Sequence, residues 1–214
     1  MEIQFPVSRQ IETLDDVAEG AAWLVLREPR FAHVLDLTGP WPLRRSPDGF
    51  EALLDAIIGQ QVSTSAARAI AARMQAAGLW SEAQIAAATE VALRAAGLSR
   101  PKARYALALA HAGIDWPSLR TRPDSEVQAT LVALPGIGPW TAEIYAMFAL
   151  GRPDVLAAGD LALQEAARHL FDLPLRPTDR QLRGLAEQWS PWRAVAARGL
   201  WAYYRHIKSK DGIR

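Results

Sequence analysis

Residues 134–142 read Leu-Pro-Gly-Ile-Gly-Pro-Trp-Thr-Ala and lie between two apolar helical patterns. Gly136 and Gly138 allow the backbone to curl round an anion, and the amides that begin the next helix have no intrahelical partners. Asp160 stands twenty positions after Trp140, just before another helical pattern. The spacing predicts a phosphate-binding hairpin with a carboxylate that acts on the bound molecule. A plain turn between helices is the alternative.

Two roles are open to Asp160. As an N-cap, its side chain would accept hydrogen bonds from the amides of Ala162 or Leu163, a contribution of about 1 kcal/mol. As a catalytic group, it would act on the molecule to which the bound phosphate belongs. The residues alone favour capping. Both roles would use the carboxylate oxygens of Asp160, so they could compete.

Cysteine is absent, which excludes disulfides, thiolate metal sites and a cysteine nucleophile. The four histidines are far apart, and none forms the i, i+3 or i+4 pair that a helical metal site uses. They are His33, His111, His169 and His206. We therefore expect no metal held by side chains and no cofactor.

The net charge of +1 hides an uneven distribution of charged residues. Residues 1–60 hold 5 basic and 10 acidic side chains, a net −5, whereas residues 61–214 hold 19 and 13, a net +6. Residues 91–114 contain four basic side chains and no acidic one. Local basic patches suit a polyanion that binds one face of the protein. Solvated helix faces are the alternative interpretation.

The composition is typical of an all-α protein. Half of the residues are hydrophobic (50%), mostly Ala and Leu, and no strand-type alternation extends beyond a few residues. Caps, glycines and prolines predict about ten short helices, with Asp124 as the cap of the one that precedes the hairpin. The expected helices cover residues 15–28, 30–37, 50–59, 64–77, 81–87, 89–96, 101–112, 124–133, 140–150, 160–171, 178–189 and 191–207.

We expect a compact fold of two helical subdomains with an active-site cleft between them. Residues 1–50 form an N-terminal extension that packs with the C-terminal helices, and residues 51–160 form a central subdomain with the helix-hairpin-helix at about 125–150. Residues 161–214 complete the second subdomain. No apolar run is long enough to span a bilayer, and the N-terminus lacks the layout of a signal peptide.

Four ordered motifs resemble the helix-hairpin-helix DNA glycosylases that carry a catalytic aspartate, and within them the bacterial 3-methyladenine DNA glycosylase II family. The motifs are the hairpin at 134–142, Asp160, Gly-Gln-Gln-Val-Ser at 59–63, and Trp-Ser-Pro-Trp-Arg at 189–193 followed by Leu-Trp at 200–201. The larger relatives begin with a small β-domain, whereas only about fifty residues, expected to be helical, precede the shared region here.

The resemblance implies a monofunctional DNA glycosylase. Such an enzyme flips alkylated purines of the N3- or N7-methyl type out of a duplex and hydrolyses the N-glycosidic bond, which begins base excision repair. Asp160 would be the catalytic residue. Trp140 occupies the position where related bifunctional enzymes have a Schiff-base lysine, and an indole cannot form an imine. Trp140 and Trp201 would flank the base, because an indole face attracts a flat cation by about 1 to 2 kcal/mol.

The same resemblance implies a wedge and a pocket lining. Gln61 would fill the gap that the flipped base leaves, where the closest relatives have leucine. A surface glutamine at a helix boundary is the alternative. Ile144 and Leu161 would line the base pocket at positions where better-known relatives tend to have tyrosine, which implies a less aromatic and more open pocket.

The hairpin would hold a DNA phosphate. The residues assigned to this contact are Gly136, Ile137, Gly138 and Thr141. The resemblance also implies a monovalent cation at the hairpin carbonyls of Leu134 and Gly136.

We expect a monomer in the cytoplasm, associated with the nucleoid, whose partner is double-stranded DNA with damaged bases and which has no membrane partner. Two alternatives stay open. The first is a glycosylase for oxidised or deaminated bases, which would need hydrogen-bond donors for a neutral lesion, whereas Trp140, Ile144 and Leu161 are apolar. The second is a non-catalytic helix-hairpin-helix module that binds DNA, in which Asp160 is only a cap.

Overall fold

The computed structural model describes residues 9–210. These residues form helices and connecting loops without a strand, so the all-α prediction is confirmed. The helices are α1 (Leu14–Arg27), α2 (Arg30–Thr38), α3 (Phe50–Gly59), α4 (Thr64–Ala76), α5 (Glu82–Ala86), α6 (Glu90–Ala95), α7 (Arg100–Ala110), α8 (Trp116–Leu119), α9 (Asp124–Val132), α10 (Pro139–Phe148), α11 (Leu161–Leu170), α12 (Asp179–Leu185), the 3-10 helix η1 (Ala186–Trp189) and α13 (Arg193–Lys210). Within residues 9–210, no helix is long and apolar enough to cross a membrane.

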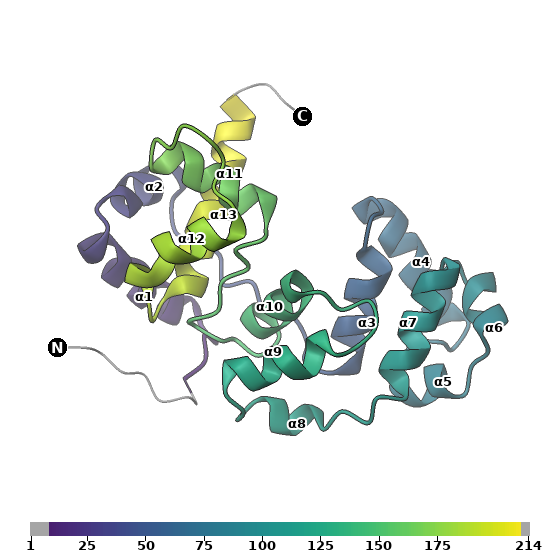
Figure 1. Cartoon of the computed structure of the whole chain (residues 1–214). Coiled ribbons are helices and arrows are strands. Elements are labelled where there is room, and N and C mark those ends of the chain that lie inside the picture. The colour runs from purple at the N-terminus through teal and green to yellow at the C-terminus, as the bar shows by residue number, and fades with distance from the viewer. Residues whose placement is uncertain (1–8, 211–214) are drawn as a thin grey trace. The chain divides into compact units, whose positions relative to one another are not determined.

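The chain divides into two compact units. The first contains the residues up to Arg45 and those from Ala146 onward, and the second contains Ser46–Tyr145. Helices α1, α2 and α11–α13 thus belong to the first unit and α3–α9 to the second. The reader can find these helices in Figure 1 by their labels and by the colours, which follow the residue number. The boundary falls within α10, so the first unit also includes the loop that leads to Asp160.

Helix α13 is the centre of the first unit and contacts α1, α2 and α11 (Figure 1). Its buried residues are mostly small, which lets neighbouring side chains approach its backbone. They are Ala194, Val195, Ala196, Ala197, Arg198, Gly199, Leu200 and Ala202. Gly199 shows how close the packing is, because a Cβ there would lie 2.6 Å from the ring of Trp41. The first unit thus joins segments from both ends of the chain.

Helix α7 is the centre of the second unit and contacts α3, α5 and α6. The apolar face of α3 that the sequence spacing predicts is buried, and each fully buried Leu or Ile contributes roughly 1.5 to 3 kcal/mol. That face comprises Phe50, Leu53, Leu54, Ile57 and Ile58. Helix α7 therefore has a fixed place against α3, which matters because both helices support the loops of the candidate site.

Helix ends agree with the expected caps in most places. The hydroxyls of Ser63 and Thr178 accept from the amides three residues on, which begins α4 and α12. The prediction that Asp124 caps its helix is wrong: Pro123 holds the N-cap position with an extended ψ, and Asp124 is the first helical residue, where its charge suits the helix dipole.

Several other helix boundaries differ from the sequence predictions, and the helix expected over 178–189 consists of α12 followed by η1. The last helix begins at Arg193, because the amide of Trp192 donates to the carbonyl of Trp189 at 2.7 Å and closes a turn first. The short helix α8, capped by Asp115, was not predicted.

Candidate functional site

The hairpin between α9 and α10 contains two glycines in different situations. Gly136 has a φ of +84°, and a Cβ there would lie 2.3 Å from the ring of Tyr105. Gly138 lies outside the positive-φ region, and nothing lies within 4 Å of a Cβ placed on it. Gly136 therefore makes the turn, whereas Gly138 keeps the space beside the first turn of α10 open for a close approach.

Two of the hairpin residues assigned to the phosphate contact are internal. Ile137 and Thr141 are buried, and Ile137 fills the space inside the hairpin as its position predicts. The carbonyl of Leu134 accepts from the amide of Ile137 at 3.1 Å. The carbonyl of Gly136 accepts from Gln60 Nε2 at 2.8 Å. Each carbonyl has a second lone pair, so the cation at Leu134 and Gly136 stays a prediction.

A hydrogen-bonded brace joins the end of α3 to the hairpin. Lys102 Nζ donates to the carbonyls of Ile58 at 2.8 Å and Gln60 at 2.6 Å, while the Gln60 side chain reaches Gly136. Burial lowers the pKa of Lys102. Because Lys102 and Tyr105 are three residues apart on α7, one side of this helix supports both the 58–60 backbone and the hairpin.

Gln61 lies directly beyond this brace. Its side chain is exposed, and its φ of +55° is a left-handed conformation that costs a residue with a Cβ about 1 kcal/mol or more. The residue before it is fixed, because Lys102 holds the Gln60 carbonyl and the Gln60 side chain binds the Gly136 carbonyl. A strained, exposed residue on a fixed support suits the wedge role predicted for Gln61, and that role stays a prediction.

Asp160 is the N-cap of α11, as the capping interpretation predicts. Its Oδ1 accepts from the amides of Ala162 at 2.9 Å and Leu163 at 3.1 Å. The same oxygen accepts from the indole Nε1 of Trp201 at 3.2 Å. These three N-H groups fix the carboxylate beside an aromatic ring. The structure thus brings together Asp160, the predicted catalytic residue, and Trp201, which was predicted to flank the base.

An aromatic and cationic cluster surrounds Trp201 within the first unit. The Phe148 ring lies 5.6 Å from the Trp201 ring at an interplanar angle of 37°. The guanidinium of Arg44 lies over both rings, at 5.7 Å from Phe148 and 5.8 Å from Trp201. Arg198, fully buried, lies 5.1 Å from the Phe148 ring. Burial, followed by the neighbouring cations Arg44 and Arg45, lowers the pKa of Arg198 to about 10.

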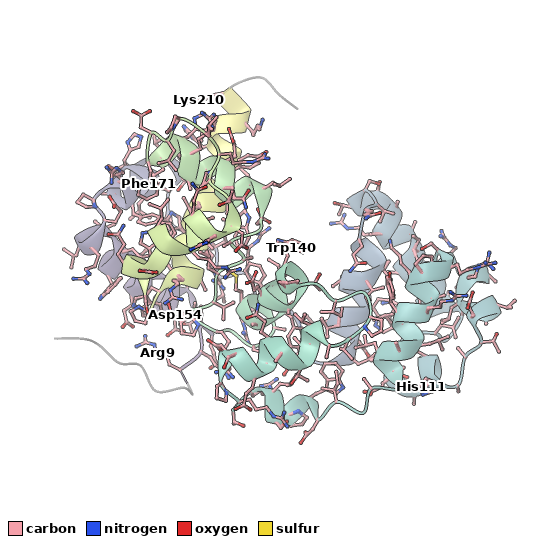
Figure 2. All side chains as sticks on the ribbon, viewed as in Figure 1. Arg9, His111, Trp140, Asp154, Phe171 and Lys210 are labelled. Atoms are coloured by element: carbon pink, nitrogen blue, oxygen red, sulfur yellow. The ribbon has the colours of Figure 1, made fainter. Side chains whose placement is uncertain are left out.

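The other predicted pocket residues are at least partly accessible. Trp140 is 44% exposed near the start of α10 (Figure 2), Leu161 is 62% exposed at the start of α11, and Ile144 is half-buried. Trp140 and Ile144 belong to the second unit, whereas Leu161 belongs to the first with Asp160. Their accessibility is compatible with contact to a base, and their role in the pocket stays a prediction.

Sequence reasoning missed residues in both of these clusters. Gln60 and Lys102 form the brace, and Arg44 and Phe148 lie beside Trp201. The sequence held a partial signal for Gln60, which is part of the 59–63 motif. Lys102 belongs to the basic run at 91–114, which the sequence associated with a polyanion and not with a brace. The sequence held no signal for Arg44 and Phe148, because an arginine in a loop and a phenylalanine on an apolar helix have no distinctive spacing.

Residues 54–191 match the model of a family described as the HhH-GPD superfamily base excision DNA repair protein. The chain belongs to the HhH-GPD superfamily. Among solved structures, this HhH-GPD protein is similar to a DNA-3-methyladenine glycosidase of Bacillus halodurans, with a TM-score of 0.81, 29% identity and 94% of each chain covered. It is also similar to Schizosaccharomyces pombe Mag1 in complex with abasic DNA, with a TM-score of 0.75, 28% identity, and 86% of this chain and 95% of Mag1 covered.

Curated relatives agree with this placement. The HhH-GPD protein is 32% identical to the probable bifunctional transcriptional activator/DNA repair enzyme AlkA of Mycobacterium tuberculosis, over 92% of this chain and 42% of that protein. It is 32% identical to DNA-3-methyladenine glycosylase 2 of Escherichia coli, over 72% of this chain and 57% of that protein. The chain therefore spans about half the length of these curated relatives.

Proposed function

We propose that this HhH-GPD protein is a monofunctional DNA glycosylase that flips and excises alkylated purines of the N3- or N7-methyl type. One observation carries the proposal: Trp201 donates to the Oδ1 of Asp160, which sets an electron-rich ring and a carboxylate side by side. The similarity to two proteins named DNA-3-methyladenine glycosylases supports it.

The proposed reaction is hydrolysis at C1′ of the damaged nucleotide. The C1′-N bond breaks and its electron pair leaves with the base, so a purine alkylated to a cation departs neutral. Asp160 stabilises the positive charge that develops on the sugar. A water oxygen then bonds to C1′ and releases one proton to solvent, which leaves an abasic site. A cationic base needs no general acid to leave, and the proposal assigns none.

Trp201 and Trp140 recognise the base through their indole faces in this proposal, with Ile144 and Leu161 as apolar lining. A flat cation gains about 0.5 to 2 kcal/mol on an indole face, more as water is excluded. A neutral oxidised base would instead need hydrogen-bond donors, and the four residues assigned to recognition offer only the two indole N-H groups. Of these, the Trp201 N-H already binds Asp160.

The hairpin and Gln61 handle the duplex in this proposal. Gly138 and the first turn of α10 approach a phosphate, with Gly136, Ile137 and Thr141 shaping the backbone that presents the amides. Gln61 enters the gap left by the flipped nucleotide, whose unpairing costs a few kcal/mol. The partner is thus double-stranded DNA with a damaged base, bound by a monomer through few phosphates, so its affinity is modest and sensitive to salt.

Replacement of Asp160 by Asn separates catalysis from capping. Asparagine is as good an N-cap as aspartate, so the thermal unfolding midpoint should hardly change. Release of N7-methylguanine from a methylated duplex should fall by about 100-fold or more, because an amide cannot stabilise the sugar cation. Unchanged base release would refute the catalytic assignment of Asp160, whereas absence of base release from the wild type would leave the non-catalytic binding module. Duplex affinity, measured in parallel, should persist.

Two further assays test the reaction type and the substrate class. Borohydride should trap no covalent adduct with DNA, because Trp140 cannot form an imine. A panel of duplexes with N3-methyl and N7-methyl purines, hypoxanthine and 8-oxoguanine should give release of the methylated bases first. Release confined to the neutral lesions would favour the oxidised- or deaminated-base alternative.

A further inference from the structure

Arg44 holds the place of a flat cation against the aromatic side chains beside Asp160. Its guanidinium lies 5.8 Å from the ring of Trp201 and 5.7 Å from that of Phe148. Guanidinium is planar, delocalised and weakly hydrated, and these are the properties that favour stacking on an indole. An N-methylated purine has the same flat, delocalised positive charge. Arg44 therefore makes the contact that the proposed function assigns to the substrate.

The local charges agree with this placement. Burial lowers the pKa of Arg44, the nearby Arg205 lowers it further, and Asp160 raises it. Asp160 therefore attracts the Arg44 guanidinium, while Arg205 and Arg198 repel it. The Asp160 carboxylate and two aromatic rings thus hold the Arg44 guanidinium in place, whereas the positive charges of Arg205 and Arg198 favour its departure. An incoming cationic base would meet the same attraction and repulsion.

The backbone beside Arg44 is fixed, although the side chain is exposed. Arg198 Nε donates to the carbonyl of Leu43 at 3.0 Å, and Arg198 itself is 1% exposed. Arg44 has a φ of +45°, a conformation that residues with a Cβ rarely adopt. This anchored, strained residue aims its side chain at Trp201 from a loop that sequence alone describes only as a break between helices.

We propose that Arg44 is a built-in competitor of the damaged base: it occupies the Trp201 face in the free protein and must leave before a flipped base can stack there. This inference rests on the proposed function for the identity of the incoming base. Every base must displace the guanidinium, but only a cationic base restores a positive charge on Trp201 and beside Asp160. A base therefore stacks on Trp201 only if its interaction with the ring is stronger than that of Arg44. Weakly stacking, undamaged bases do not meet this condition.

Nucleoside binding tests the competition without base excision. Wild type, Arg44→Ala and the neighbouring control Arg45→Ala are titrated with N7-methylguanosine by calorimetry. Arg44→Ala should bind the nucleoside about 3- to 30-fold more tightly, as loss of a competing cation-π contact predicts, and Arg45→Ala should bind it as wild type does. In a Trp201→Ala background the same Arg44→Ala change should give no gain. Equal or weaker binding by Arg44→Ala would overturn the proposal.

Duplex experiments separate competition from two other roles of an arginine. In single-turnover excision, Arg44→Ala should accelerate release of N7-methylguanine and of neutral hypoxanthine by similar factors, because both displace the same group. Acceleration of the cationic base alone would mean simple charge repulsion and would overturn the competition. Weaker binding of an undamaged duplex would mean a phosphate contact and would overturn it too. If no base is released by any variant, the proposed function fails, while the nucleoside titration still decides the role of Arg44.

Discussion

The two units of this HhH-GPD protein prepare their parts of the candidate site in different ways. In the second unit the defined feature is the conformation of the backbone. Gly136 and Gln61 have positive φ, and the side chains of Lys102 and Gln60 donate to carbonyl oxygens. In the first unit side chains gather round one oxygen and one ring, those of Asp160 and Trp201. A loop that must follow a phosphate backbone needs defined backbone shape, whereas a centre that must act on charge needs defined side chains.

The strongest test of this contrast is Trp201→Ala in the first unit. The change removes the ring face and the N-H that Asp160 Oδ1 accepts, while the two cap amides remain. We expect base release to fall by about 100-fold, since stacking and a catalytic electrostatic contact each contribute about 1 to 3 kcal/mol. Single-turnover excision of N7-methylguanine measures it.

The matched variant for this test is Trp201→Phe. It keeps an aromatic ring without a donor, so its rate should fall between those of wild type and Trp201→Ala. A rate equal to that of Trp201→Ala would assign the whole effect to the N-H and none to the ring. Unchanged rates for both variants would contradict the role of the side-chain cluster.

The second test compares two glycines of one hairpin. Gly136→Ala forces a Cβ into left-handed backbone and toward Tyr105, and should reduce the free energy of unfolding by about 1 to 3 kcal/mol. Gly138→Ala meets neither obstacle, so its stability should match that of wild type. Thermal unfolding and duplex affinity are measured for both variants.

Affinity is the sharper measurement for these glycines. A methyl group on Gly138 would stand in the space through which a phosphate is proposed to approach, so Gly138→Ala should bind a duplex several-fold more weakly while folding normally. Wild-type affinity in this variant would show that DNA does not approach this part of the hairpin backbone.

The same contrast explains what the sequence could and could not predict. Gly136, Asp160 and the helix limits depend on residues a few positions apart, and local spacing revealed them. The cap assigned to Asp124 failed because a proline and an acidic residue both suit a helix start, and only the backbone angles distinguish them. The position of Arg44 could not be predicted, because its loop is held by a hydrogen bond from Arg198 to Leu43, and these two residues are 155 positions apart in the sequence.

The third test concerns the brace. Lys102→Met removes two hydrogen bonds from a charged donor to the 58–60 backbone and should lower the free energy of unfolding by about 1 to 2 kcal/mol. Excision should fall further than this stability loss explains at a temperature where the variant is folded, because Gln61 loses its support. Arg104→Ala, on the same helix and in an exposed ion pair, is the control and should change stability by less than about 1 kcal/mol. Equal behaviour of the two variants would show that the brace does not position the wedge.

The smallest change in stability is expected for Gln61→Gly, and it is an increase, whereas Gly136→Ala and Lys102→Met should decrease stability. Glycine adopts a φ of +55° without the strain that a Cβ causes there, so the free energy of unfolding should rise by up to about 1 kcal/mol. Removal of the wedge should nevertheless slow excision from a duplex, because nothing fills the gap of the flipped base. Excision from a single strand should be unaffected, since no gap opens there. A variant that gains stability and loses only duplex activity would show that the strain at Gln61 serves function. Equal losses on duplex and single strand would mean a general effect on the site instead of a wedge, and unchanged excision from both would leave Gln61 as a surface glutamine at a helix boundary.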